Sequence, residues 1–234
     1  MLPRQVEAEW LDELSADDPR AVRSRHDLVR LNRWMLQGGI MARALRKHAA
    51  PRPRRLLDLG GGDGSFMLGV ARRLASRWSG LSVTLLDRKD IVSRQTRAAF
   101  AALGWDLDTT SADVFEYFET ASLSDVDIIT ANLFLHHFSN DQLRRLFTQA
   151  ARTSALFVAC EPRRSKFTVE VGRMLWVIGC NDVTVHDGVA SARAGFSGRE
   201  LSALWPSEGG RHLREHPAGL FSHCFVARPA MPKW

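Results

Sequence analysis

Four glycines fall within five residues directly after an apolar run, and this stretch carries the strongest sign of chemistry in the sequence. Residues 56–64 read Leu-Leu-Asp-Leu-Gly-Gly-Gly-Asp-Gly, and an apolar-periodic segment follows from Phe66 to Leu74. The pattern predicts a buried strand, a tight turn and a helix. Glycine permits positive φ and lets backbone N–H groups approach a ligand closely. We therefore expect a site for a nucleotide-type cofactor, as in the first strand–helix turn of Rossmann-like sheets.

Histidines supply the candidate groups for proton transfer. His136 and His137 are adjacent in the stretch 133–141, Leu-Phe-Leu-His-His-Phe-Ser-Asn-Asp. His186 precedes Asp187, so it could be a base with an acidic neighbour. Imidazole suits this role because its pKa lies near neutrality. The non-catalytic alternatives are a histidine packed under the loop for the first pair and a polar loop around His186.

Carboxylates end several of the apolar runs. Asp87 ends the second run, where a carboxylate can accept both hydroxyls of a ribose. Asp113 follows the third run and is either a ligand-binding group or the cap of a short helix. Glu161 follows the fifth run and could orient a substrate hydroxyl or pair with a nearby arginine.

Alternating strand and helix patterns must position these groups. From residue 55 onward the alternation indicates βαβ units and a parallel sheet. The predicted strands are 55–60, 81–87, 106–111, 126–131 and 155–160, with helices near 64–78, 90–103, 140–151 and 166–179. Two last strands, 212–215 and 221–227, flank a turn at 216–219. A long helix over 20–48 precedes the sheet, and the Gly38-Gly39 pair weakens its middle and indicates a bend there.

The length of 234 residues suits one large α/β domain. The proline- and arginine-rich stretch 51–55 is the best candidate linker, so we expect an N-terminal helical cap or lid at 1–50 and the main domain at 51–234. Aromatic and methionine side chains outside the sheet could cover a flat apolar ligand or belong to the core. They are Trp34, Met35, Met41, Met174, Trp176 and Trp205.

Composition and charge limit the classes of binding partner that we expect. The net charge is +6, but the basic residues are spread along the chain and interleaved with acids, so we expect no nucleic-acid partner. No run approaches the length of a membrane span, and the N-terminus lacks the apolar core of a signal peptide, which predicts a cytoplasmic protein. Cys160, Cys180 and Cys224 have no metal-binding spacing, and no His/carboxylate pattern indicates a metal site.

The spacing of the glycine stretch selects a family. It does not fit the dinucleotide pattern G-x-G-x-x-G/A. Asp58-x-Gly60-x-Gly62-x-Gly64 resembles motif I of the class I S-adenosylmethionine (SAM) dependent methyltransferases. The resemblance covers about residues 55–228. It implies a Rossmann-like α/β fold, with a seven-stranded sheet that ends in an antiparallel hairpin, and SAM as cofactor, with S-adenosylhomocysteine (SAH) as product.

The resemblance also assigns the cofactor contacts. It implies that Asp58 and the glycines surround the methionine end of SAM, that Asp87 holds the ribose, and that Asp113 and Val114 meet the adenine. The fourth strand should end near the transferred methyl group. The full predicted cofactor-binding set is Asp58, Gly60, Gly62, Gly64, Asp87, Arg88, Asp113, Val114 and Asn132.

Residues 133–141 indicate the subclass. They resemble the L-H-D-W-S-D segment of small-molecule O-methyltransferases, in which the histidine is the general base. His136 takes that position, while His137 replaces the acidic residue and Phe138 the tryptophan. The stretch after strand four lacks the N/D-P-P-Y/F signature of amino-group methyltransferases. The resemblance thus implies methylation of an aromatic or polyketide-like small molecule, at oxygen, with a histidine base.

Three alternatives stay open from the sequence. Carbon methylation of an electron-rich ring would need the same pocket and a base. An RNA methyltransferase would fit the positive charge, although the arginines are scattered. A SAM-binding protein without catalysis, acting as a partner subunit, would keep the glycine motif and Asp87. The acceptor and the oligomeric state are not given by the sequence.

Overall fold

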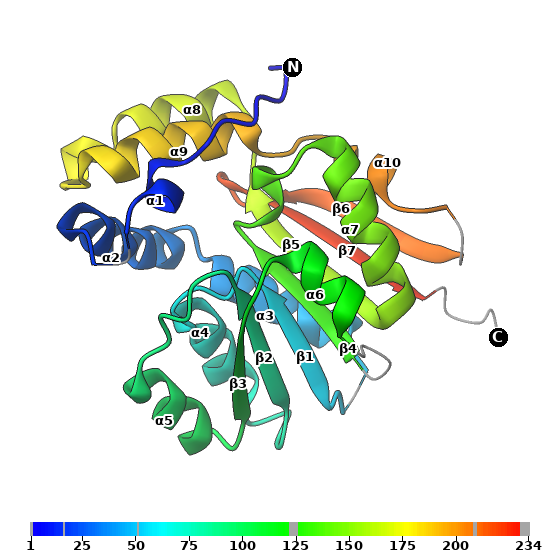
Figure 1. Cartoon of the computed structure of the whole chain (residues 1–234). Helices are drawn as coiled ribbons and strands as arrows, with labels where there is room; N and C mark the ends of the chain where they lie inside the picture. The colour runs from blue at the N-terminus through cyan, green and yellow to red at the C-terminus, as the bar shows by residue number, and fades with distance from the viewer. Residues whose placement is uncertain (1, 16, 51, 122–125, 208–209, 230–234) are drawn as a thin grey trace.

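A seven-stranded mixed sheet forms the centre of the computed structural model, which describes residues 2–15, 17–50, 52–121, 126–207 and 210–229 (Figure 1). The strand order is β3-β2-β1-β4-β5-β7-β6, in which β1 to β5 are parallel and β7 and β6 are antiparallel to their neighbours. The strands are β1 (Arg55–Leu59), β2 (Ser82–Asp87), β3 (Asp106–Ser111), β4 (Val126–Asn132), β5 (Ser154–Pro162), β6 (Arg211–Ala218) and β7 (Ser222–Pro229). The order reverses between β1 and β4, which places a crevice at their carboxyl ends.

Alternating side chains of the strands build two cores, one on each face of the sheet. Leu56 packs with one cluster and Leu57 with the other, and Ile128 and Ile129 divide in the same way. This follows from the two-residue period of a strand, and it explains why the central strands are mostly apolar. The buried thiols of Cys160 and Cys224 face one another across β5 and β7 as unpaired cysteines.

Helices cover both faces. One face is covered by α3 (Gln37–His48), α4 (Ser65–Leu74) and α5 (Arg94–Ala102), and the other by α6 (Val114–Thr120), α7 (Asn140–Thr153) and α10 (Glu200–Leu204). The remaining helices, α1 (Trp10–Glu13), α2 (Pro19–Trp34), α8 (Lys166–Arg173) and α9 (Asp182–Ala194), pack together above the carboxyl ends of the parallel strands (Figure 1). Short 3-10 helices are η1 (Leu135–His137) and η2 (Leu175–Ile178). Of these helices, α1 and α2 contribute side chains to the wall of the crevice.

The helix predicted over 20–48 is two helices. It breaks at Met35 and Leu36, just before the glycine pair, and Leu36 adopts φ 56° at the junction. The break lets α3 bury Met41 and Leu45 against the sheet while α2 leaves toward α9. The predicted linker begins at Pro51, which lies outside the described residues.

Three other boundaries differ from the sequence prediction. The segment 166–179 is α8 followed by η2, not one helix. The segment around His186 is helical within α9, where Asn181 caps the helix by accepting a hydrogen bond from the amide of Thr184. The predicted turn at 216–219 is partly strand, because pairing of β6 with β7 continues to Ala218 and the chain reverses at 219–221.

Among the described residues, the helices lack the length and apolar character needed to cross a bilayer.

Candidate cofactor and acceptor site

The glycine loop between β1 and α4 needs glycine for two separate reasons. Gly60, Gly62 and Gly64 have φ of 72°, 54° and 76°, values that side chains disfavour. A Cβ on Gly60 would also lie 2.5 Å from the ring of Phe134. The amides of Gly60 and Gly61 both donate to the carbonyl of Leu86, so the loop is held against the end of β2.

Asp87 fixes the loop from the end of β2. One of its carboxylate oxygens accepts from the Gly62 amide at 2.9 Å, and the other accepts from the Lys89 amide at 3.0 Å. Each carboxylate oxygen can accept more than one hydrogen bond, so Asp87 keeps capacity for a ligand's hydroxyls. The residue therefore joins the glycine loop to the cavity beside it.

Asp58 is buried in the middle of the sheet beneath this loop. It is 2% exposed and accepts a hydrogen bond from the Thr130 hydroxyl at 2.6 Å. Burial raises the pKa of Asp58 to about 7, against the lowering by the Thr130 hydrogen bond, and the charge of Asp87 adds to the rise. A cation bound nearby would offset the cost of ionising this carboxyl.

Asp113 performs the capping role that the sequence left as its alternative. It accepts a hydrogen bond from the Phe115 amide at 2.8 Å and so caps α6, and its second oxygen pairs with Arg88 at 2.8 Å. Burial acts to raise the pKa of Asp113, but the hydrogen bonds from Arg88 and Phe115 outweigh it and lower the pKa. Asp113 therefore caps α6 and also borders the cavity, as Val114 does.

One cavity of about 630 Å³ lies at the switch point and brings most of the predicted residues together. Its lining includes Asp58, Gly60, Gly62, Asp87, Arg88, Asp113, Val114, Asn132 and His137. Three predicted residues, Gly64, His136 and His186, are outside the lining. The opposite wall comes from the N-terminal segment, which we define as residues 2–14, and from α2, Phe134 and Phe138.

The cavity residues fit an adenosyl amino-acid cofactor. The buried Oδ1 of Asn132 has no hydrogen-bond partner among the described residues, so it offers an acceptor to a ligand donor. Asp87 and Asp113 provide carboxylates at the ends of β2 and β3, and the glycine loop leaves room for a close approach. SAM held there would supply an activated methyl group.

The two adjacent histidines are set by Glu161 at the end of β5. Glu161 is fully buried and accepts hydrogen bonds from the amides of Phe134, Leu135 and His136 at 3.1, 2.9 and 3.3 Å. It also bonds Nδ1 of His136 at 2.8 Å. The carboxylate thus caps η1 and orients the imidazole. Among the described residues, the ion-pair partner of Glu161 is His136 and not an arginine.

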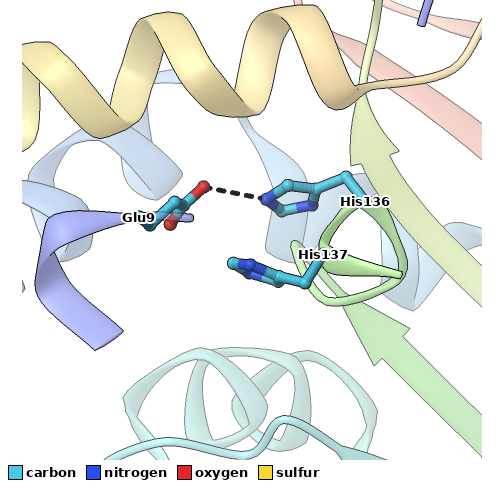
Figure 2. Close-up of side chains that lie close together, drawn as sticks. All are labelled: Glu9, His136 and His137. Carbon is cyan, nitrogen blue, oxygen red and sulfur yellow. Dashed lines mark hydrogen bonds and ion pairs between the residues drawn. The ribbon is translucent and has the colours of Figure 1, made fainter. Parts of the chain in front are cut away.

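His136 lies between two carboxylates. Its Nε2 is 3.2 Å from Oε1 of Glu9, opposite the bond to Glu161 (Figure 2). Burial acts to lower the pKa of His136, but the hydrogen bonds and charges of Glu161 and Glu9 outweigh it and raise the pKa to about 9. Burial likewise acts to raise the pKa of Glu9, and the partnership with His136 overcomes it and lowers the pKa to about 2.

His137 borders the cavity, whereas His136 does not. The rings of the two residues lie beside one another, with ring centroids 4.2 Å apart.

His186, in contrast, stacks on Trp10 with ring centroids 3.9 Å apart and its Nδ1 lies 2.9 Å from a carboxylate oxygen of Asp187. Asp187 in turn accepts from the amides of Trp10 and Leu11, which places this pair at the start of α1.

The aromatic and methionine residues predicted as a cover are outside the cavity lining. Met41 and Trp205 are core residues, whereas Trp34, Met174 and Trp176 are exposed. Sequence reasoning missed the true second wall, above all Glu9, because no local pattern in residues 2–14 marks it. Phe134 and Phe138, the aromatic residues beside the histidine pair, were the sequence feature that could have indicated this second wall.

Comparisons with known proteins agree with this geometry. Residues 56–155 match a family described as a methyltransferase domain. No curated protein sequence matches the chain significantly.

Solved structures share the fold at low identity. An O-methyltransferase candidate from Nostoc punctiforme is 16% identical with a TM-score of 0.61, covering 96% of this chain and 64% of its own. The mitomycin 7-O-methyltransferase MmcR is 19% identical with a TM-score of 0.58, covering 93% and 60%. The plantazolicin methyltransferase BpumL, solved with SAH, is 14% identical with a TM-score of 0.62, covering 92% of each chain.

This chain therefore spans just under two thirds of the O-methyltransferase structures that head the comparison, and nearly all of BpumL. Together, the match of residues 56–155 to a methyltransferase domain, the strand order and the solved structures show that the chain has a Rossmann-like methyltransferase fold.

Proposed function

We propose that the protein transfers a methyl group from SAM to an oxygen of a small, largely aromatic acceptor. The observation that carries this proposal is the composition of the cavity at the switch point. One side has the glycine loop, Asp87 and Asp113. The other has apolar side chains, among them Leu28, Phe134 and Phe138, together with His137 and charged residues of the N-terminal segment and α2 such as Glu9 and Arg25. Such a division suits a polar cofactor beside a flat apolar acceptor.

The proton of the acceptor hydroxyl must be removed as the methyl group is transferred. Among the predicted histidines, His137 is the one that borders the cavity. His136 is 2% exposed, and both its nitrogens are bound by Glu161 and Glu9. We therefore assign the proton-accepting role to His137 and the positioning of the η1 loop to His136. His186 serves the packing of α1.

The residues assigned to the cofactor keep the roles that the family resemblance implies. Asp87 holds the ribose hydroxyls while it fixes Gly62, and Asp113 meets the adenine while it caps α6. Asp58 neutralises positive charge at the methionine end. Arg88, Asn132 and Val114 complete the contacts. The N-terminal 50 residues act as the cap of the acceptor half, and residues 51–234 form the methyltransferase domain.

The first test is calorimetric titration of SAH into the wild-type chain and into Asp87→Asn. We expect wild type to bind SAH and the variant to bind at least tenfold more weakly, since the amide cannot accept from both ribose hydroxyls and the Gly62 amide as a carboxylate does. Asp90→Asn is the matched control, because Asp90 is close to Asp87 in the sequence, is half exposed and pairs with Arg97.

Acceptors are then screened with methyl-labelled SAM against a phenol panel. A labelled methyl ether supports oxygen transfer, and a carbon-methylated ring would replace that part of the proposal. A folded wild-type chain that binds no SAH would overturn the proposal as a whole. His137→Gln should remove turnover while leaving SAH affinity within a few-fold of wild type.

A further inference from the structure

We propose that Glu9, His136 and His137 form a binding site for a divalent transition-metal ion of the Zn²⁺ type. Each residue offers one ligand atom, and these atoms all lie within 4.8 Å of one another. The two histidines come from η1, and Glu9 reaches them from the N-terminal segment, 127 residues away from His136 in the sequence. Figure 2 shows the three side chains converging from these two elements.

The spacing of the ligand atoms suits such an ion. Zinc binds imidazole nitrogen and carboxylate oxygen at about 2.0–2.2 Å, so two ligand atoms of a tetrahedral site lie about 3.4 Å apart. Nε2 of His136 and Oε1 of Glu9 are 3.2 Å apart. An ion can therefore replace the proton that these two groups share, with little movement of either. The ligand atom of His137 lies within 4.8 Å of the other two, so the ring would move closer to them to complete the set.

The surroundings of His136 are those of a metal-binding imidazole. Glu161 takes the Nδ1 side of the ring at 2.8 Å and is itself fixed by three backbone amides. A carboxylate on one ring nitrogen orients the ring and makes the other nitrogen a stronger ligand. The hydroxyl of Ser191 donates to the ligating oxygen of Glu9, which holds the second ligand in place.

The ligand types select the class of ion. Two imidazoles and one carboxylate suit zinc and its transition-metal neighbours, whereas Mg²⁺ prefers oxygen ligands alone. Three protein ligands leave a fourth position open, as in catalytic zinc sites. Glu9 and His137 both line the cavity, so the open position borders the acceptor half.

The ion would have two effects. It would tie the N-terminal segment to the η1 loop across the cavity. If the proposed function holds, an acceptor hydroxyl at the open position would lose its proton to water more easily, because a bound divalent ion lowers the pKa of an oxygen ligand by several units. The metal would then do the work assigned above to His137, which would serve as a ligand. Ion binding itself does not depend on the proposed function.

The test is titration of Zn²⁺ into chelator-stripped protein by calorimetry, with Co²⁺ absorption as a spectroscopic measure of the ligand field. We expect one ion per chain, at least tenfold weaker binding in Glu9→Gln and in His137→Gln, and no competition from Mg²⁺. Glu7→Gln and His212→Gln are the matched controls. They alter a carboxylate on the same segment and an exposed histidine elsewhere, and should bind Zn²⁺ as wild type does.

Circular dichroism establishes that each variant is folded. No zinc binding by the folded wild-type chain, or equal binding by Glu9→Gln and wild type, overturns the metal site. A parallel SAH titration separates the two proposals. SAH binding without zinc binding removes the metal site alone, and zinc binding without SAH binding removes the proposed function alone.

Discussion

At the scale of single residues, Glu161 organises more of the site than any residue that borders the cavity. A fully buried carboxylate is costly unless it is hydrogen-bonded and paired. Here three backbone amides and the imidazole of His136 satisfy it. Since those amides belong to consecutive residues 134–136, one side chain determines the shape of the whole loop that carries both histidines.

Asp58 gives a prediction at the same scale. Its pKa in the folded protein is about 7, above the ordinary 3.8, so folding binds a proton between these values. The stability of wild type should therefore fall as pH rises from 4 to 7, by on the order of 4 kcal/mol, because each pKa unit corresponds to about 1.4 kcal/mol. Asp58→Asn keeps an acceptor for Thr130 and cannot ionise. We expect it to lose this pH dependence and to be more stable than wild type above pH 7.

Urea unfolding at pH 5 and pH 8 measures both effects. Asp141→Asn is the control, since the side chain of Asp141 is almost fully exposed. Equal pH dependence in wild type and Asp58→Asn would contradict the prediction. The same change should weaken SAH binding, which would make Asp58 a residue that lowers stability in favour of ligand binding.

At the scale of elements, the N-terminal segment is the part of the wall that crosses the cavity without belonging to the sheet. Arg4 holds it by donating to the carbonyls of Ala194, His136 and Phe138 at 2.8, 3.1 and 2.8 Å. Asp187 caps α1 within the same segment. These contacts link the segment to α9 and to the η1 loop at once.

Arg4→Ala should loosen this segment selectively. Hydrogen bonds from a charged group contribute about 1.5–3 kcal/mol, so amide exchange in residues 8–14 should speed up at least tenfold while exchange in β1 and β4 stays unchanged. Hydrogen exchange with mass spectrometry measures both regions. Arg144→Ala is the control, because Arg144 pairs with Asp141 on the exposed face of α7. Unchanged exchange in residues 8–14 would show that Arg4 does not hold the segment.

How far the sequence predicts each element depends on how local its cause is. The glycine loop and Asp87 were predictable because their cause lies within a few residues of sequence. The helix break at Leu36 depends on how α3 packs against the sheet, which no local sequence pattern shows. The helix α9 was not predicted, because the sequence analysis considered His186 and Asp187 but not Asn181, the residue that caps the helix. The contact of Glu9 with His136 joins distant residues, and nothing local in either segment encodes it.

At the scale of the whole molecule, several arginines are engaged by other parts of the chain. Arg4, Arg164 and Arg211 donate to backbone carbonyls, and Arg30 and Arg173 pair with acids on their own helices. These arginines contribute less of the net charge of +6 to a phosphate-binding face than side chains without such partners would.

We expect any binding of bulk RNA at low salt to disappear by about 200 mM salt, since non-specific phosphate contacts weaken steeply with ionic strength. A filter-binding series over 20–200 mM salt measures this. RNA retained at the upper end would reverse the expectation and favour an RNA acceptor.

The two ends of the described chain lie in very different surroundings. The N-terminal segment forms part of the cavity wall, whereas β7 runs antiparallel to β5 and carries the chain away from the cavity edge of the sheet (Figure 1). Val6, Glu7, Ala8, Glu9 and Leu11 line the cavity, so a fluorophore attached within residues 6–11 would lie where a bound ligand changes its surroundings. A second fluorophore near the end of β7 would lie at the opposite edge of the sheet, and it would serve as the internal reference for the first.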